Sequence, residues 1–148
     1  MIGEMCMRDV VVIAKDAAVA EAARLMRRHH VGALVVTVTR EALTVPVGIL
    51  TDRDIVVEVL AQDVDPRTVT VGDIMSAELL TAVVTDSLWD TLQRMRQYGA
   101  RRVPVVDAGG GLQGIVTLDD VLELLAEELA VLARLVASER HHEEAQRP

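Results

Sequence analysis

The chain has very few aromatic residues. Among its 148 residues there is no phenylalanine, and Trp89 and Tyr98 are the only tryptophan and tyrosine. Base stacking, on which proteins that bind single-stranded nucleic acid depend, is poorly served by two aromatic side chains. A clustered basic face is not expected either, because the formal net charge is -8. The composition therefore argues against nucleic acid as the main partner, and it predicts a core of aliphatic residues and methionine.

Cysteine and long apolar runs are also scarce. The single cysteine, Cys6, excludes an intramolecular disulfide and fits a reducing compartment. The longest apolar runs, such as residues 10–14, are far shorter than the roughly 20 residues that a membrane-spanning helix needs. The first residues contain Glu4 and no basic segment before an apolar stretch, so they do not resemble a secretory signal. We therefore expect a soluble cytoplasmic protein with no membrane partner.

A short motif occurs twice in the chain. Residues 48–55 read Gly-Ile-Leu-Thr-Asp-Arg-Asp-Ile, and residues 114–121, 66 positions further on, read Gly-Ile-Val-Thr-Leu-Asp-Asp-Val. The match extends backwards at an offset of 69, at which Gly3 aligns with Gly72, if the first copy has three extra residues in one loop. A repeat of this length indicates one small fold present twice, with related sites in the two copies.

Each copy predicts the order strand, helix, strand, strand, helix, so the expected fold class is α/β (α+β), with the copies packed in pseudo-two-fold symmetry. In the first copy, we expect strands at 10–14, 32–37 and 45–50, a loop at 37–46, and helices at 17–29 and 51–62. Asp16 is the expected N-cap of the first helix. In the second copy, we expect strands at 79–84, 102–106 and 112–116, and helices at 87–98 and from 117.

The chain is expected to divide into three parts. These are repeat 1 at 1–69, repeat 2 at 70–128, and a helical extension with a polar tail at 129–148; Pro66 marks the linker. Apolar residues recur at spacings of four, three and four, at Leu125, Leu129, Leu132 and Val136. This predicts an amphipathic helix to about residue 136, followed by a frayed tail. Two alternatives stay open for its apolar stripe, packing within the chain or a dimer interface.

The repeated motif places a threonine and an aspartate three positions apart where a strand turns into a helix. Thr51 with Asp54, and Thr117 with Asp120, fit a capping box, which is worth about 1 kcal/mol and needs no ligand. The same geometry offers free N–H groups and the positive end of a helix dipole to an anion. The threonine hydroxyl can then donate to a phosphate and the aspartate can accept from ribose hydroxyls. Both functions are compatible.

On these motifs, the sequence resembles a tandem pair of CBS domains, the regulatory unit often called a Bateman module. The resemblance covers residues 3–126 and includes Arg-Val-Pro-Val-Val-Asp at 102–107 and Val-Gly-Asp-Ile-Met at 71–75. Small stand-alone bacterial proteins with two CBS domains, including the hypoxic response type, are similar. The resemblance implies an adenosine-type ligand, such as AMP, ADP or ATP, at up to two sites between the copies. No cofactor is required, and Mg²⁺ would arrive only with a polyphosphate.

The resemblance also implies the residues that bind the ligand: the aspartate for the ribose, the threonine for a phosphate, and apolar residues for the adenine. The first site would use Val12, Ile13, Val31, Ala33, Thr51, Arg53 and Asp54. The second site would use Thr81, Ala82, Ala100, Arg101, Arg102, Val103, Pro104, Thr117 and Asp120.

The two copies are not identical at these positions. Arg53 stands where the second copy has Asp119, and the basic pair at 101–102 stands where the first copy has glycine and alanine. We therefore expect two sites of unequal affinity. The basic pair also fits a solvated pair at the start of a strand, and that alternative stays open.

Other classes of site are less well supported. The paired aspartates of the two motifs have no nucleophile or histidine beside them, so they do not indicate acid–base catalysis. The histidine pairs at 29–30 and 141–142 are adjacent residues, which point to different faces of a helix, so no metal site is expected.

The leading interpretation is a non-enzymatic regulatory module that senses an adenosine-type ligand. A chain without a catalytic or transport domain is expected to act in trans on a regulated protein, as a homodimer. The alternative is a ligand-free homodimeric interaction protein whose motifs serve only as helix caps.

Overall fold

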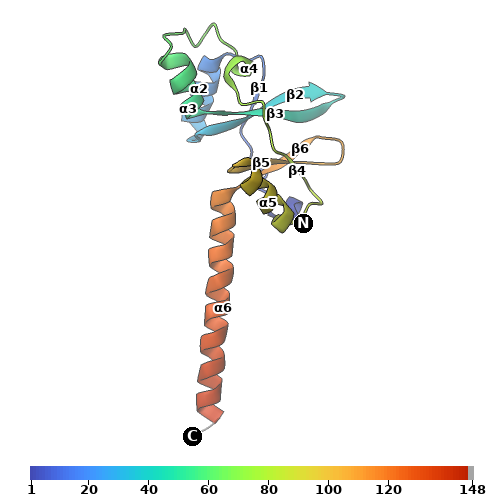
Figure 1. Ribbon diagram of the computed structural model, residues 1–148, viewed down its shortest axis with the longest axis vertical. Helices are drawn as coiled ribbons and strands as arrows, with labels where there is room; N and C mark the ends of the chain where they lie inside the picture. Colours follow the sequence, from blue (N-terminus) through green and yellow to red (C-terminus); the bar gives the residue numbers. More distant parts are fainter. Residues whose placement is uncertain (147–148) are drawn as a thin grey trace. The chain divides into compact units, whose positions relative to one another are not determined.

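The computed structural model describes residues 1–146. It divides into two units, Met1–Val116 and the chain from Thr117 onwards. The first unit contains two three-stranded sheets with their helices, and the second contains the long helix α6 (Leu118–Gln146) (Figure 1).

The first sheet consists of β1 (Val12–Ala14), β2 (Ala33–Arg40) and β3 (Leu43–Thr51) in that order. β1 runs parallel to β2, and β2 runs antiparallel to β3 with a register shift at Val36/Thr37. The loop predicted at 37–46 is wrong, because most of it is strand. The hairpin turns at Glu41 and Ala42, whose φ angles of 50° and 65° bend the chain within two residues.

Helix α2 (Val19–His29) is capped differently from the prediction. Asp16 is not its N-cap; the cap is Ala18, whose side chain makes no capping hydrogen bond. The backbone N–H groups of Val19 and Ala20 instead donate to the carbonyls of Val69 and Pro66, each at 3.0 Å. Carbonyls of the linker thus satisfy N–H groups that a capping side chain would otherwise satisfy.

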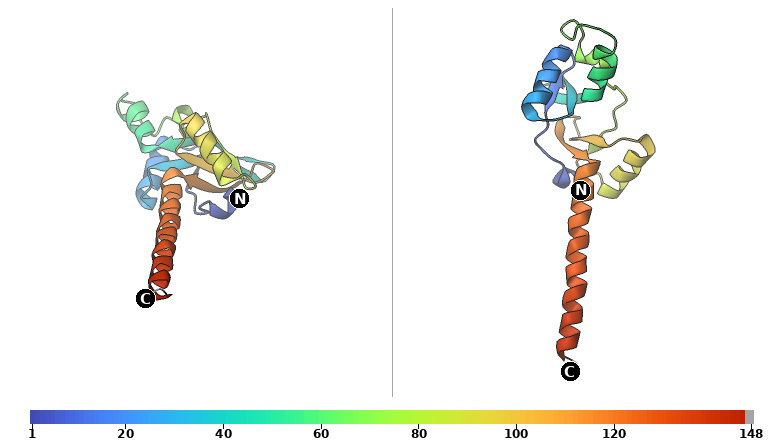
Figure 2. Two further views of the ribbon diagram at one scale, coloured as in Figure 1. Left: turned by 60° about the horizontal axis from the view of Figure 1, so that its bottom comes forward. Right: turned by 90° about the vertical axis from the view of Figure 1, so that its left-hand side faces the viewer.

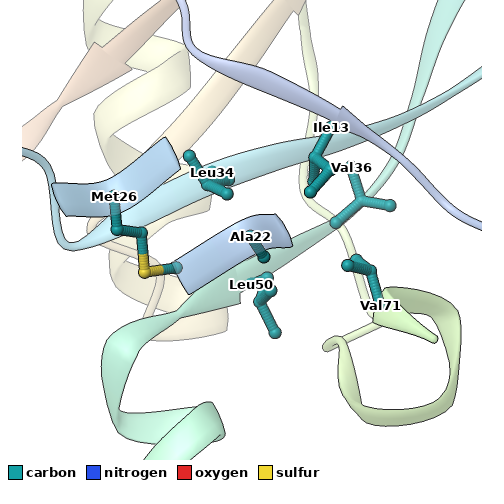
Figure 3. Close-up of a cluster of buried hydrophobic side chains, with 7 residues drawn as sticks. All are labelled: Ile13, Ala22, Met26, Leu34, Val36, Leu50 and Val71. Carbon is teal, nitrogen blue, oxygen red and sulfur yellow. The ribbon is translucent and has the colours of Figure 1, made fainter. Parts of the chain in front are cut away.

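Two helices cover one face of the first sheet. α3 (Asp52–Ile55) continues as the short π-helix η1 (Val56–Leu60), which ends before the predicted residue 62. α2 and α3 lie side by side (Figure 2). Between these helices, the short helix α4 (Val71–Ile74) and the sheet lies a buried aliphatic cluster (Figure 3). Its members are Ile13, Ala22, Met26, Leu34, Val36, Leu50 and Val71.

The second copy follows the predicted order closely. Its sheet contains β4 (Ala82–Val83), β5 (Arg102–Val106) and β6 (Leu112–Thr117), with β4 parallel to β5. β4 is shorter than the predicted strand at 79–84. Helix α5 (Leu88–Tyr98) begins after Ser87, whose hydroxyl accepts from Asp90 N at 3.1 Å. The mixed α/β class and the twofold repetition of the fold are confirmed.

The segment that leads into each copy packs on the other copy. α1 (Ile2–Met5) lies against the second copy, where Gly3 N donates to Val84 O at 3.0 Å. α4 lies against the first copy, where Gly72 N donates to Lys15 O at 2.8 Å. A Cβ on either glycine would lie 2.8 Å from a side-chain carbon of its partner, so both positions require glycine. The two contacts are equivalent, because both glycines and both carbonyl residues are related by the repeat offset of 69.

α6 is one continuous helix of 29 residues (Figure 1). The predicted end near residue 136 and the predicted frayed tail are wrong as far as residue 146; residues 147–148 lie outside the described part. The segment 137–146 contains no glycine or proline, and it has three glutamates and two alanines, which favour helix. Among the helices of residues 1–146, none combines the length and hydropathy needed to span a membrane.

Candidate functional site

The motif of the first copy forms a complete capping box at the start of α3. Asp54 N donates to Thr51 Oγ1 at 3.2 Å, and Thr51 N donates to Asp54 Oδ2 at 2.9 Å. The sequence places this box where β3 ends, because threonine favours strand and its hydroxyl can cap the helix that follows. One carboxylate oxygen of Asp54 is therefore already engaged by its own backbone.

The sheet brings several predicted residues of the first site together. Ala33 on β2 is the register partner of Thr51 on β3, and Val31 lies two residues before Ala33. Of the two predicted β1 residues, Val12 is 39% exposed, whereas Ile13 is 4% exposed and belongs to the core. Val12 can therefore offer surface to a ligand and Ile13 cannot. The side chain of Arg53, inside the motif, is exposed.

The motif of the second copy is only half closed. Asp120 N donates to Thr117 Oγ1 at 3.2 Å, as in the first copy. The reverse bond from Thr117 N is not formed within the described part of the chain. Instead, Asp120 Oδ2 is buried and has no hydrogen-bond partner among residues 1–146. Buried polar atoms of native proteins are nearly always paired, so this oxygen is an exception that needs an explanation.

The remaining predicted residues of the second site differ in accessibility. β4 and β5 bring Ala82 close to the fully buried Val103 and Pro104 by pairing it with Val105. These three residues form part of the core and expose no surface in this structure. By contrast, Ala100 and Thr81 are half-buried, and the side chains of Arg101 and Arg102 are exposed.

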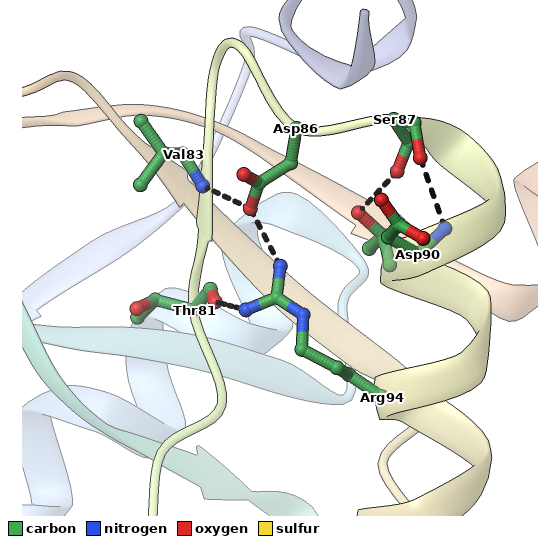
Figure 4. A network of polar contacts seen from close by, with 7 residues as sticks. Thr81, Val83, Asp86, Ser87, Asp90 and Arg94 are labelled. Carbon is green, nitrogen blue, oxygen red and sulfur yellow. Dashed lines mark hydrogen bonds and ion pairs between the residues drawn. The ribbon is translucent and has the colours of Figure 1, made fainter.

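An ion pair that the sequence reasoning missed fixes the segment before β4 (Figure 4). Asp86 Oδ2 accepts from Arg94 Nη2 at 2.6 Å and from Val83 N at 3.0 Å. Arg94 Nη1 also donates to Thr81 O at 3.1 Å. Leu25 stands at the position equivalent to Arg94 in the first copy, so the network belongs to the second copy alone. Arg94 thus positions the backbone of a predicted ligand-binding residue.

A cavity of about 740 Å³ borders the end of β1, directly after the predicted residues Val12 and Ile13. Its lining consists of Ala14, Lys15, Asp16, Thr37, Val38, Thr39, Thr70, Gly72 and Asp73. Thr37 is four residues along β2 from Ala33, which corresponds to about 13 Å. The backbone N–H of Thr70, 3.0 Å from Asp73 Oδ2, and then the Thr70 hydroxyl lower the pKa of the Asp73 carboxyl below its ordinary value. The lining includes one ammonium group, of Lys15, and two carboxylates, of Asp16 and Asp73. This mixture of charges does not indicate a single class of ligand.

Cys6 and His30 have structural roles. Cys6 is buried, and its Sγ donates to Gly3 O at 3.4 Å. His30 ends α2 in the left-handed region with φ 55°, at the position equivalent to Gly99 in the second copy. Within the described range 1–146, no three histidine, cysteine, aspartate or glutamate residues cluster as a metal site would require.

Comparison with known proteins identifies a repeated family match. The model of the CBS domain matches residues 2–61 and 71–127. The chain is 37% identical over 110 residues to hypoxic response protein 1 of Mycobacterium tuberculosis, covering 74% of each chain. It is 35% identical over 123 residues to the uncharacterized protein MK0525 of Methanopyrus kandleri, covering 83% of this chain. It spans only 61% of the length of MK0525.

A solved structure supplies a ligand for comparison. The chain superimposes with a TM-score of 0.70 on the CBS domain pair of protein MJ0100 in complex with 5′-methylthioadenosine and S-adenosyl-L-methionine. The two sequences are 26% identical, and the alignment covers 86% of this chain and 97% of the other. Both ligands of that protein contain an adenosine group.

Proposed function

Because this chain belongs to the CBS-domain family, as a tandem pair of CBS domains, we propose that it is a non-enzymatic sensor of an adenosine-containing ligand. The ligand-bound state is then passed to a regulated protein in trans. The complex of the MJ0100 pair with two adenosyl ligands supports this ligand class. No catalytic step is assigned to the aspartates of the motifs.

The observation that carries the proposal is the buried, unpaired Oδ2 of Asp120. Leaving a buried acceptor without a donor costs about 1–3 kcal/mol, and more for a charged group. The two hydroxyls of a ribose are donors that a carboxylate accepts through charge-assisted hydrogen bonds. In the proposed complex, they pair with Asp120, while Thr117 and the N-terminal N–H groups of α6 face a phosphate or another polar substituent.

The first copy is proposed to bind the same ligand more weakly. Asp54 Oδ2 already accepts from Thr51 N at 2.9 Å, so a ribose hydroxyl must share or displace that bond. The closed box also supports a second candidate function, in which the motif is only a helix cap and the protein is a ligand-free interaction protein. The two copies are thus proposed to differ in affinity, with the second copy binding more tightly.

Self-association and a cytoplasmic location are part of the proposal. Exposed apolar side chains on η1, among them Val56 at 51% and Leu60 at 70% exposed, support association with another protein surface. The buried free thiol of Cys6 supports a reducing compartment.

A ligand screen by thermal unfolding tests the proposal. AMP, ADP, ATP, NAD, S-adenosylmethionine and 5′-methylthioadenosine are added to the full chain, and at 100 times its Kd a ligand stabilises the fold by about 2.7 kcal/mol. We expect at least one of them to do so, and we expect Asp120→Asn to lose about 1.4 kcal/mol or more of this stabilisation. No shift with any of the six would favour the ligand-free alternative, and sustained turnover of one of them would overturn the non-enzymatic assignment.

A further inference from the structure

α6 presents an apolar stripe to solvent. Leu122, Leu125, Leu129, Leu132 and Val136 recur at spacings of three, four, three and four, and their side chains are 44% to 67% exposed. We call these five residues the α6 stripe. The spacing is that of the a and d positions of a heptad, the pattern with which one helix packs against another along its length. The stripe extends for about 21 Å along the helix axis.

The positions beside the stripe are almost free of charge. Ala126 and Ala133 flank it on one side, and Glu128 and Leu135 flank it on the other. In a chain with a net charge of -8, a surface that meets another copy must avoid like charges in contact. Among these four flanking residues only Glu128 is charged, so a second copy can approach with little repulsion.

The opposite face of α6 argues against a membrane as the partner. Helices that lie on a membrane surface place lysine and arginine on their polar face, where they meet anionic lipid. The outer face of α6 carries Glu123 and Glu127, with Arg134 as its basic residue over the length of the stripe. This acidic face would be repelled by an anionic lipid surface. The stripe therefore fits a protein helix of the same kind.

We propose that the α6 stripe packs antiparallel against the α6 stripe of a second copy of this chain. The inference rests on the self-association included in the proposed function, and it adds the α6 stripe to the exposed apolar side chains of η1 as a surface for that association. In a parallel pair in register, the heptad would continue with Glu139 and Glu143 facing the same residues of the second copy. An antiparallel pair centred between Leu129 and Leu132 avoids these like-charged layers.

The antiparallel register also fits the small side chains. It sets Leu125 opposite Val136 of the second copy and places Ala126 beside Ala133 of the second copy. Alanine at these flanking positions lets the two helices approach closely. In this register Leu122 lies opposite Glu139 of the second copy, so four stripe residues of each chain pair with the stripe of the other. With the flanking Leu135, which is 55% exposed, ten half-exposed aliphatic side chains from the two copies offer on the order of 100 Å² each. The contact therefore covers about 1,000 Å², the lower end of specific interfaces.

Disulfide trapping in the full-length chain tests the register. Cys6→Ser removes the only native cysteine, and Leu125→Cys and Val136→Cys are then introduced into two chains that carry different tags. We expect the mixed 125–136 disulfide to form at least fivefold faster than the mixed disulfide of the control pair, Glu127→Cys with Arg134→Cys. The control pair lies at the same level on the outer face. Equal rates for the two pairs, or a predominant 125–125 disulfide, would overturn the proposal.

Sedimentation equilibrium of point variants tests the interface independently. Leu129→Asp places a charge in the stripe, and Val131→Asp places one at a similarly exposed position outside it; the wild-type residues are 67% and 55% exposed. We expect Leu129→Asp to weaken self-association at least tenfold and Val131→Asp less than threefold. Equal effects, or none, would contradict the pairing.

Ligand binding separates this inference from the proposed function. Both aspartate variants should keep the ligand-induced thermal shift of the parent chain, because their side chains lie outside the motif. A chain that pairs through α6 but binds no ligand retains this inference and refutes the sensor. A chain that binds ligand but shows no stripe-specific pairing retains the proposed sensor function and refutes the pairing of α6.

Discussion

Replacing the aspartates of the two motifs by alanine, one at a time, separates helix capping from ligand binding. Asp54→Ala removes the acceptor of the 2.9 Å bond from Thr51 N. We expect the free energy of unfolding of the unliganded chain to fall by about 1 kcal/mol, the usual value of a capping interaction. Asp120→Ala removes no such bond, because the reciprocal bond from Thr117 N is not formed in the second copy.

The magnitude for Asp120 follows from two opposing effects. Removing a buried, unpaired acceptor relieves a desolvation cost of about 1–3 kcal/mol. Losing a negative charge in the first turn of α6 gives up about 0.3–1 kcal/mol of attraction to the helix dipole. The unliganded Asp120→Ala chain should therefore be as stable as the parent or more stable. Its stability should exceed that of Asp54→Ala by about 1 kcal/mol or more.

With ligand present, we expect Asp120→Ala to have the larger effect of the two substitutions. Asp120→Ala should weaken binding at least tenfold and so lose about 1.4 kcal/mol of the ligand-induced stabilisation, whereas Asp54→Ala should keep most of it. Urea denaturation with and without ligand measures both quantities, and Asp120→Asn controls for side-chain volume. Equal destabilisation of the unliganded chain by Asp120→Ala and Asp54→Ala would contradict the unpaired state of Asp120. An unchanged affinity in Asp120→Ala would contradict its role in ligand binding.

Three further predictions concern the scaffold. Gly48→Ala should lower the free energy of unfolding by about 1–3 kcal/mol in urea denaturation, because its Cβ would lie 2.6 Å from Met75 Sδ. His30→Gly should raise the thermal midpoint by relieving about 0.5–1 kcal/mol of strain at φ 55°; an unchanged midpoint would refute this. The lowered pKa of Asp73 stabilises the fold above the ordinary aspartate pKa, and this contribution is lost as the pH falls through the lower folded value. Asp73→Asn should therefore flatten the pH dependence of stability below about pH 4, as measured by denaturation at several pH values.

Most of the element order could be predicted because the motif ties a strand end to a helix start in each copy. Thr51 is the observed N-cap of α3, as its spacing to Asp54 predicts. The prediction for Asp16 was wrong because carbonyls of the linker, distant in sequence, satisfy the first N–H groups of α2. Both strands of the hairpin β2–β3 could be predicted, but not their full length, because the turn uses Glu41 and Ala42, which are not typical turn residues.

The candidate site was predictable only in its local part. Spacing alone indicated both threonine–aspartate pairs, but the pattern Thr-x-x-Asp forms a closed box in one copy and a half-open box in the other. The two intervening residues differ between the copies, and the spacing does not predict which box closes. The ion pair of Asp86 with Arg94 was missed because it joins a loop to the second turn of α5. No periodicity in the sequence marks such a contact.

The exchanged entry segments offer a route by which ligand at the second motif can affect the first copy. Met7 N donates to Ile115 O, and Ile115 N donates to Met7 O, both at 2.9 Å. Ile115 lies two residues before Thr117, and Met7 lies on the segment that leads into β1 of the first copy. If ligand orders the backbone at Thr117, both bridge N–H groups should exchange with deuterium more slowly. Peptides containing Met7 and Ile115 should show this protection in the parent chain and lose it in Asp120→Ala. Protection confined to the peptide with Thr117 would show that the bridge does not couple the copies.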